Sequence, residues 1–344
     1  MYFMKLPVDS ASSMVLPPSI SVTPRADKIK QLKRVLRNAA RNSAIFQEKL
    51  AHLQIPDLND EQDFIRKVPI LRLEDLEEAR SSTGDPFSGR KCQGKAAQLT
   101  FQLETGGEVP LYIALSRRDL RLYAQALGNC WRLLGLTKGD RVDIFDYGSS
   151  PISYLASSAF MPYLYRGAAD ELGCITLCND GVSQMSQRAI EIIRFIRPRV
   201  FFIRSDCLFP FSREVKRQGI TLPEYIEALV VTEDDGIPSI RSCQTWADAL
   251  GVPVYRLLRV DVAMFLGVEC PHCHFLHINN DLYFVEAVQK GQDGTQEKSN
   301  AGLLTITNLF ARMTPTIRYV SHVRGVLMGP GCTQSPEDER VQLG

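Results

Sequence analysis

The residues best suited to chemistry lie in the segment ECPHCHFLH, residues 269–277. Cys270 and Cys273 form a C-x-x-C pair, and His274 and His277 follow one and four positions after the second cysteine. Thiolate and imidazole groups are ligands that Zn²⁺ prefers. A catalytic zinc would also need an open coordination position and a general base, and no carboxylate here is clearly placed for that role. The segment indicates either a structural zinc site or a zinc-type turn that does not close, with free thiols.

A glycine-rich loop, LETGGEVP at residues 103–110, offers a second kind of chemistry. Loops rich in glycine and hydroxyl residues hold phosphate groups through their backbone amides. This loop contains no lysine, and Glu108 would repel a triphosphate. It is a working nucleotide loop, the remnant of one, or a tight turn between two strands. Its candidate residues are Thr105, Gly106, Gly107 and Pro110.

The composition excludes several classes of protein. Hydrophobic residues make up 44% of the 344 residues, which is typical of a globular protein with a core. The formal net charge of +1 leaves no global field to attract duplex nucleic acid. No stretch reaches the roughly 20 apolar residues that a membrane helix needs. Nine scattered cysteines do not form the pattern of a disulfide framework, so we expect a cytoplasmic protein. From the charge and the lack of a long apolar stretch, we expect that it binds neither nucleic acid nor membrane.

Strand-like and helix-like patterns alternate in the middle of the chain. The elements they predict form the scaffold that positions the candidate residues. Repeated strand-helix units favour a mainly parallel sheet covered by helices on both faces. One expected helix begins after Ser116 and carries Asp119 at its third position, which is the spacing of a capping box. Asp143 and Asp146 stand at the end of an expected strand, where we expect turn or capping roles.

The two ends of the chain predict different kinds of secondary structure. Residues 25–53 place apolar side chains at helical spacing with basic residues between them, which predicts an amphipathic helix pair broken near Asn42 and Ser43. The basic residues form a solvated face or, as a second interpretation, bind a partner. Short strands joined by turns after residue 261 predict an antiparallel region.

The order of these pieces resembles the phenylacetate-CoA ligase branch of the adenylate-forming (AMP-binding) enzymes. The similarity runs from roughly residue 42 to 332 and is carried by segments such as TGGEVP, GDRVDIFDYG, GAADELGCITL and PTIRYV in a shared order. The resemblance implies that a carboxylic acid and ATP give an acyl-adenylate and pyrophosphate, after which coenzyme A displaces AMP. ATP, Mg²⁺ and CoA are then the implied cofactors, and a carboxylic acid or an acyl or aryl thioester is the implied partner.

The resemblance also implies an α/β fold, namely the large domain of these enzymes with a smaller antiparallel β region near its C-terminus. The expected parts are a flexible N-terminal tail at 1–24, an N-terminal helical segment at 25–92, an α/β sheet core at 93–260 and the antiparallel subregion with the zinc candidate at 261–344.

Two departures from the family's pattern concern the residues expected to bind the phosphates and the metal ion. Only Glu108 and Val109 stand between the glycines and the proline of the phosphate loop, so the loop is shortened and acidic. Tyr255 matches the family's Tyr-Gly-x-Ser/Thr-Glu stretch, but Arg259 stands where the metal-binding glutamate is expected. An arginine cannot ligate Mg²⁺.

Two further departures concern the residue expected to bind the ribose and the C-terminal lid domain. Arg318 and Tyr319 match the family's Arg-Tyr-x-Thr-Gly motif, but Val323 takes the place of the ribose-binding aspartate. The C-terminal lid with its catalytic lysine is expected to be absent, because the sequence ends at Gly344. Together, the four departures indicate degraded nucleotide motifs and identify the glycine loop as the remnant of a phosphate loop.

Some members of this branch carry a structural zinc, and the resemblance implies the ligands here. Cys270 and His277 match the family's pattern, and Cys332 matches the first cysteine of its Cys-x-Cys, but Gln334 replaces the second. Cys273 is then the implied fourth ligand.

The sequence leaves two functions open. The first is an acid-CoA ligase of the phenylacetate type, with impaired or lost ATP-dependent catalysis. The second is a non-catalytic helper that recognises an acyl carrier protein, a CoA thioester or a partner enzyme.

Overall fold

The computed structural model describes residues 28–94, 99–103, 110–148, 150–160, 166–235, 242–290 and 296–344, with the backbone alone at 290 and 296–298. The expected tail at 1–24 lies outside the described residues. No helix in the described ranges is long and apolar enough to cross a membrane.

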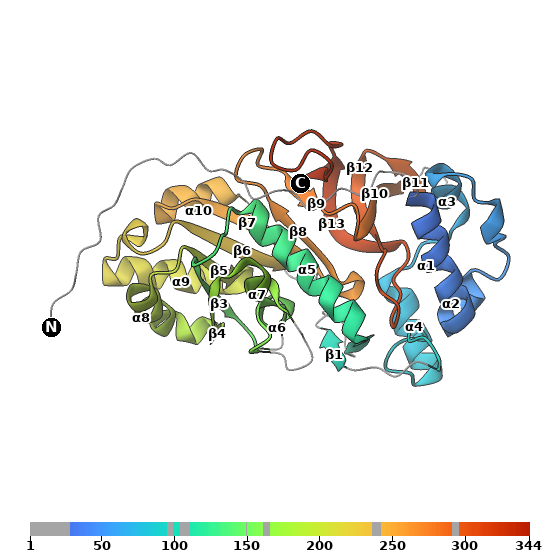
Figure 1. Ribbon diagram of the computed structural model, residues 1–344, viewed down its shortest axis with the longest axis horizontal. Coiled ribbons are helices and arrows are strands. Elements are labelled where there is room, and N and C mark those ends of the chain that lie inside the picture. The colour runs from blue at the N-terminus through green and yellow to red at the C-terminus, as the bar shows by residue number, and fades with distance from the viewer. Residues whose placement is uncertain are drawn as a thin grey trace.

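Four helices open the described chain and gather at the right-hand end of the molecule in Figure 1. They are α1 (Lys28–Asn42), α2 (Ala44–Lys49), α3 (Glu61–Lys67) and α4 (Leu73–Thr83). The expected break is confirmed, because Ser43 has extended backbone angles between α1 and α2. Its buried hydroxyl donates to the Gly89 carbonyl at 2.8 Å, which ties the break to a distant loop.

The parallel part of the sheet consists of five adjacent strands in the order β7-β6-β5-β3-β4. They are β3 (Arg141–Asp146), β4 (Ile175–Asp180), β5 (Val200–Arg204), β6 (Ala228–Asp234) and β7 (Val254–Val260). The helices that alternate with them are α5 (Arg117–Leu133), α6 (Pro151–Ala156), α7 (Ala168–Leu172), α8 (Ser186–Ile196), α9 (Ser205–Gln218) and α10 (Cys243–Leu250). The expected capping box of α5 is confirmed, since Ser116 and Asp119 bond reciprocally.

Both faces of the parallel strands are covered because side chains alternate along each strand. Phe202 of β5 packs in the same core as Trp131 of α5, whereas Phe201 packs with Phe211 of α9 on the other face. The near-continuous apolar runs of these strands, such as VFFI in β5, are the consequence of burial on both faces.

The antiparallel region continues the same sheet, and the expected fold class is confirmed. Its strands are β8 (Phe265–Glu269), β9 (Leu276–Ile278), β10 (Tyr283–Lys290), β11 (Gln296–Ser299), β12 (Ala301–Asn308), β13 (Tyr319–Leu327) and β14 (Glu339–Leu343). β7 pairs in parallel with β6 and antiparallel with β8, so one twelve-stranded sheet crosses the predicted boundary at 260/261. The division of the chain into the four expected parts stays a prediction.

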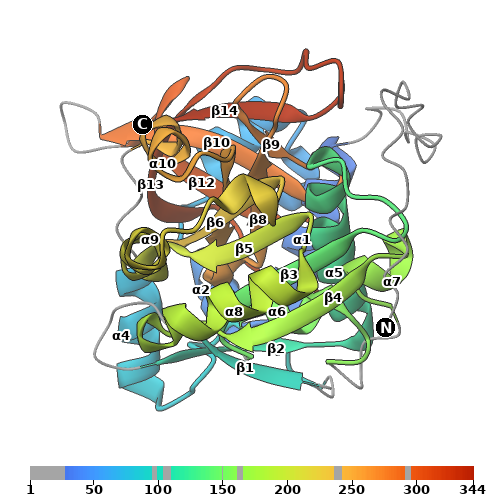
Figure 2. The same ribbon diagram turned by 90° about the vertical axis from the view of Figure 1, so that its left-hand side faces the viewer.

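A separate antiparallel hairpin joins β1 (Leu99–Leu103) and β2 (Leu111–Leu115). Figure 2 shows it at the bottom of the molecule, at the opposite end from β9 and β14.

Candidate functional site

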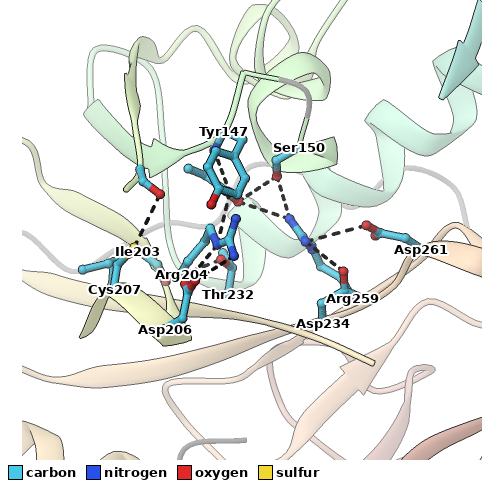
Figure 3. Close-up of polar contacts among 12 residues, drawn as sticks. Tyr147, Ser150, Ile203, Arg204, Asp206, Cys207, Thr232, Asp234, Arg259 and Asp261 are labelled. Atoms are coloured by element: carbon cyan, nitrogen blue, oxygen red, sulfur yellow. Dashed lines mark hydrogen bonds and ion pairs between the residues drawn. The ribbon is translucent and has the colours of Figure 1, made fainter. Parts of the chain in front are cut away.

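Charged side chains converge at the carboxyl ends of the parallel strands (Figure 3). Asp146 is the last residue of β3, Arg204 of β5 and Asp234 of β6, and Arg259 is the last but one in β7. Ligands of open α/β sheets bind in the crevice beyond the carboxyl ends of the strands. We call this crevice the cleft and take it as the first candidate site.

Arg259 lies at the centre of the cleft. Its Nη1 is 3.1 Å from Asp146 Oδ2 and donates to Ser150 Oγ at 2.6 Å. Its Nη2 is 3.1 Å from Asp234 Oδ2 and 3.6 Å from Asp261 Oδ2. One guanidinium, only 8% exposed, therefore bridges three carboxylates that come from three segments of the chain.

A second arginine lines the same cleft. Arg204 lies over the ring of Tyr147, 4.0 Å from the ring centroid, and donates two hydrogen bonds to Asp206 at 3.0 and 2.8 Å. Its Nε is 4.0 Å from Asp146 Oδ1. Asp206 therefore orients this guanidinium, and Arg204 approaches the network around Arg259 through Asp146.

Burial governs the protonation of this network. It raises the pKa of Asp261 to about 8, against the attraction of Arg259. Burial also raises the pKa of Asp146, again opposed by Arg259. Burial disfavours the charged form of Arg259, but Asp261, Asp146 and Asp234 outweigh it and hold the pKa of Arg259 well above its usual value. The arginine therefore stays charged, while Asp261 keeps a proton at neutral pH.

The space left in the cleft is small. The described residues enclose a cavity of about 40 Å³ there, whereas pockets for small ligands measure roughly 300–1,000 Å³. Phe101 of the hairpin stacks on Tyr154 of α6 with ring centroids 4.1 Å apart, and both rings line the cavity. Ion pairs and aromatic side chains fill the place where a ligand of this fold class would lie.

The cysteine and histidine cluster forms a second candidate site, in the antiparallel region. The donor atoms of Cys270, Cys273, His277 and Cys332 all lie within 4.8 Å of one another. The Sγ atoms of Cys270 and Cys332 are 3.9 Å apart, and Cys273 Sγ is 3.2 Å from His277 Nε2. On the other side of the ring, His277 Nδ1 lies 3.4 Å from Asp338 Oδ2.

This geometry fits a closed tetrahedral metal site. Donors that surround a zinc ion tetrahedrally at about 2.3 Å lie about 3.8 Å from one another, close to the separations in the cluster. Three thiols and one imidazole fill all four positions, which is the pattern of a structural site. A carboxylate behind the histidine, here Asp338, orients a metal-bound imidazole.

Solved structures of 2-hydroxyisobutyryl-CoA ligase are similar to this chain. An open conformation in complex with 2-HIB-AMP and CoA matches with a TM-score of 0.77 at 17% sequence identity, over 95% of this chain and 78% of that chain. The same ligase in its thioesterification state matches with a TM-score of 0.75 at 16% identity, over 92% of this chain and 67% of that one. The chain has the fold of the adenylate-forming CoA ligases. At this identity the likeness concerns the fold. No protein-family model and no curated protein matches the sequence.

Within the ligase fold, the predicted nucleotide residues are dispersed. Arg259 lies in the cleft, and Pro110 directly precedes β2 of the hairpin that covers it. Thr105, Gly106 and Gly107 lie outside the described residues.

Tyr255 lies near the amino end of β7, away from the cleft. There it lines a groove of about 940 Å³ between α10, the turn at 273–276 and β14. In this groove, the Cys243 thiol donates to Glu269 at 3.2 Å.

Arg318 and Tyr319 are buried at the start of β13. Arg318 has a positive φ of 49° and pairs with Glu286 at 2.6 Å while its carbonyl accepts from the amide of Leu71. This pairing joins β10 and β13 to the segment before α4, which is a structural contact. Burial raises the pKa of Tyr319 above its usual range.

Most of the residues that surround Arg259 are not predicted by the sequence. Asp146 was expected only in a turn or capping role, which it does fill by accepting from Tyr147 N and Ser150 Oγ. Asp234 and Asp261 were not singled out. The available signal was their position at strand ends, because Asp234 is the last residue of the strand ALVVTED and Asp261 follows directly after the strand VYRLLRV. The order of the strands, which brings these ends together, was not readable from that signal.

Proposed function

We propose that the protein is an acyl- or aryl-CoA ligase-like protein of the phenylacetate-CoA ligase type, in which ATP-dependent activation of a carboxylic acid is impaired or lost. One observation carries this proposal: Arg259 bridges Asp146, Asp234 and Asp261 in a cleft that leaves about 40 Å³ free.

The electrostatics of the cleft support the proposal. A divalent cation would need the oxygens that Arg259 already occupies, and the guanidinium itself offers no lone pair to a metal. A triphosphate would have to enter a space of about 40 Å³ in which Asp146 and Asp234 already pair with Arg259. Moving Arg259 away would leave these carboxylates unpaired, at a cost of about 3–5 kcal/mol.

Calorimetry with ATP and Mg²⁺ tests the proposal directly, and pyrophosphate exchange with a panel of aryl and fatty acids extends it. We expect no saturable heat and no exchange above that of a protein-free blank. The double variant Arg259→Gln/Asp234→Asn, which removes the arginine together with a carboxylate 3.1 Å from it, is the matched comparison. Saturable uptake of ATP by the unaltered protein, or exchange with any acid, would overturn the proposal.

For the second site we propose that Cys270, Cys273, His277 and Cys332 hold a structural zinc. The bound ion would connect the turn between β8 and β9 to the segment between β13 and β14. Because four protein ligands close the coordination sphere, the ion would stabilise the fold and take no part in a reaction. None of the nine cysteines, all of which lie in the described ranges, forms a disulfide, which supports a reducing compartment such as the cytoplasm.

A second candidate function is a non-catalytic helper that recognises an acyl carrier protein or a CoA thioester. The groove of about 940 Å³ favours it, because this groove is large enough for a ligand and stands apart from the filled cleft. Titration with an acyl-CoA and with a phosphopantetheinylated carrier protein tests this function. Gln342→Trp would obstruct the groove, and Gln187→Trp on α8 is the control. Equal binding by both variants, or none by the unaltered protein, would remove this function.

A further inference from the structure

The outer face of α1 carries a continuous row of basic side chains. Helix α1 lies at the right-hand end of the molecule in Figure 1, far from α8, α9 and α10. Residues spaced by four, three and four positions fall on one side of a helix. The exposed side chains with this spacing are Lys30, Arg34, Arg37 and Arg41. We call them the basic row, and its length is roughly 16 Å at a rise of about 1.5 Å per residue.

The opposite side of α1 fixes the orientation of this row. Its apolar side chains are buried in the main core and anchor the helix, namely Leu32, Val35, Leu36 and Ala39. Asn38 also donates to the Arg312 carbonyl at 3.2 Å, and Arg34, which belongs to the row itself, donates to the Leu309 carbonyl at 3.4 Å. The row is therefore held outward on a rigid element of the fold.

No acidic residue of α1 balances the row. The helix has the sequence KIKQLKRVLRNAARN, with no acidic residue in its first turn, where the helix dipole favours negative charge. Neither Arg37 nor Arg41 pairs with a carboxylate in the described part of the chain. Helix α8 differs, because the exposed Glu191 stands between its exposed Arg188 and Arg194.

We propose that the basic row of α1 is a docking site for an acidic helix of a partner protein. A partner helix with glutamates at the matching spacing would place carboxylates opposite Arg37 and Arg41 and along the rest of the row, so that the charges would be complementary. A lipid surface fits less well, because an amphipathic helix enters a membrane with its apolar face and that face of α1 is buried in the core. A duplex nucleic acid fits less well because one row of cations covers only a narrow strip, on a chain of net charge +1.

The proposed docking site is separate from the cleft and does not depend on the proposed function. Both can therefore be tested on the same protein with different probes.

A designed peptide is the probe for this site. It is an alanine-rich helix of about 20 residues with glutamates at the four-three-four spacing, and its control replaces each glutamate with glutamine. Fluorescence anisotropy with the full-length chain should show saturable binding of the glutamate peptide only. The affinity should fall at least about tenfold between about 50 and about 300 mM salt, because exposed ion pairs are screened.

Paired charge reversals locate the site. Arg37→Glu/Arg41→Glu should weaken binding of the glutamate peptide by about tenfold or more. Arg188→Glu/Arg194→Glu reverses the same number of exposed charges on the mixed-charge helix α8 and should leave the affinity within about twofold. Circular dichroism of both variants confirms that the fold is kept.

The outcomes of these measurements distinguish an acidic helix from other partners of the basic row. Loss of binding in the α1 variant alone supports the proposal. No binding to the unaltered chain, or equal loss in the α8 variant, overturns it. Binding of vesicles with about 30% phosphatidylserine, or of a short RNA, more tightly than the peptide and with the same dependence on Arg37 and Arg41 would also overturn it, because the row would then serve a different class of partner.

Discussion

The cleft and the cysteine-histidine cluster are both built from polar side chains that meet at the ends of strands. They differ in the source of the positive charge that balances their buried groups. In the cleft, Arg259 supplies a cation from the chain itself and lies 3.1 Å from both Asp146 and Asp234. In the cluster, the donor atoms of three cysteines and of His277 lie within 4.8 Å of one another, which is the spacing of ligands around a metal ion.

This difference shows which site is complete without a ligand. Buried charges are stable only when they are paired, and the cleft meets this condition through its own arginine. Clustered thiol and imidazole donors approach this closely when a metal binds them, and deprotonated thiols gain most from it. We therefore expect the first region to reject cations and the second to take one up. The predictions below test this contrast, beginning with the largest expected effect.

Loss of a cluster thiol should have the largest effect. Cys332→Ser should lower bound zinc from about one ion per chain to near zero and reduce the free energy of unfolding by several kcal/mol, because the ion joins segments far apart in the sequence. Metal analysis of the purified protein and urea unfolding measure both effects. Cys174→Ser, a half-buried thiol outside the cluster, is the control and should change neither. Full zinc occupancy in Cys332→Ser would contradict the assigned ligands.

Replacing the central arginine of the cleft should have the second-largest effect. Arg259→Met keeps much of the side-chain volume but leaves the carboxylates of Asp146 and Asp234 without their cation, so the free energy of unfolding should fall by about 3–5 kcal/mol. Urea unfolding measures the loss. Arg217→Met removes a surface arginine paired with Glu214 and should cost less than about 0.5 kcal/mol. An equally small change for Arg259→Met would show that the cleft does not depend on its cation.

The carboxylate behind the metal ligand should have an intermediate effect. Asp338→Asn removes the charge 3.4 Å from His277 Nδ1 and should weaken zinc binding by about 10- to 100-fold while the stoichiometry stays near one. Competition with a chromogenic chelator measures the affinity. Glu337→Gln changes the neighbouring exposed carboxylate and should leave the affinity unaltered. Equal weakening in the two variants would point to a general effect of surface charge.

The smallest expected effect is a dependence on pH. The pKa of Asp261 is raised to about 8 in the folded protein, so the folded state binds a proton that the unfolded state releases above about pH 4. Its contribution to stability is therefore greatest at low pH and is lost as the pH rises toward 8. Asn does not titrate, so between pH 6 and pH 8 the stability of Asp261→Asn should fall by up to about 2 kcal/mol less than that of the unaltered protein. Parallel curves from urea unfolding would contradict the raised pKa.

Local patterns in the sequence predicted the elements well. The apolar spacing of Leu32, Val35, Leu36 and Ala39 predicted α1, and the reciprocal pair of Ser116 and Asp119 predicted the start of α5. These features depend on neighbours in the sequence, which is why they were readable. The four cluster residues lie together as the resemblance implied, and their metal binding stays a prediction.

The surroundings of Arg259 needed the tertiary structure. The replacement of a glutamate by Arg259 was visible in the sequence, and it indicated a lost metal ligand. The partners of that arginine were not visible, because Asp146 and Asp234 are more than 20 residues from it and meet it only through the strand order β7-β6-β5-β3.

The sequence by itself determined the helices, the strands, the basic row of α1 and the chemical types available to each site, because these follow from spacing along the chain. Only the tertiary structure decided that an arginine fills the cleft and that three thiols and an imidazole approach one point. The physical reason is that both arrangements join residues from separate strands, and the pairing and register of a sheet set which strand ends meet.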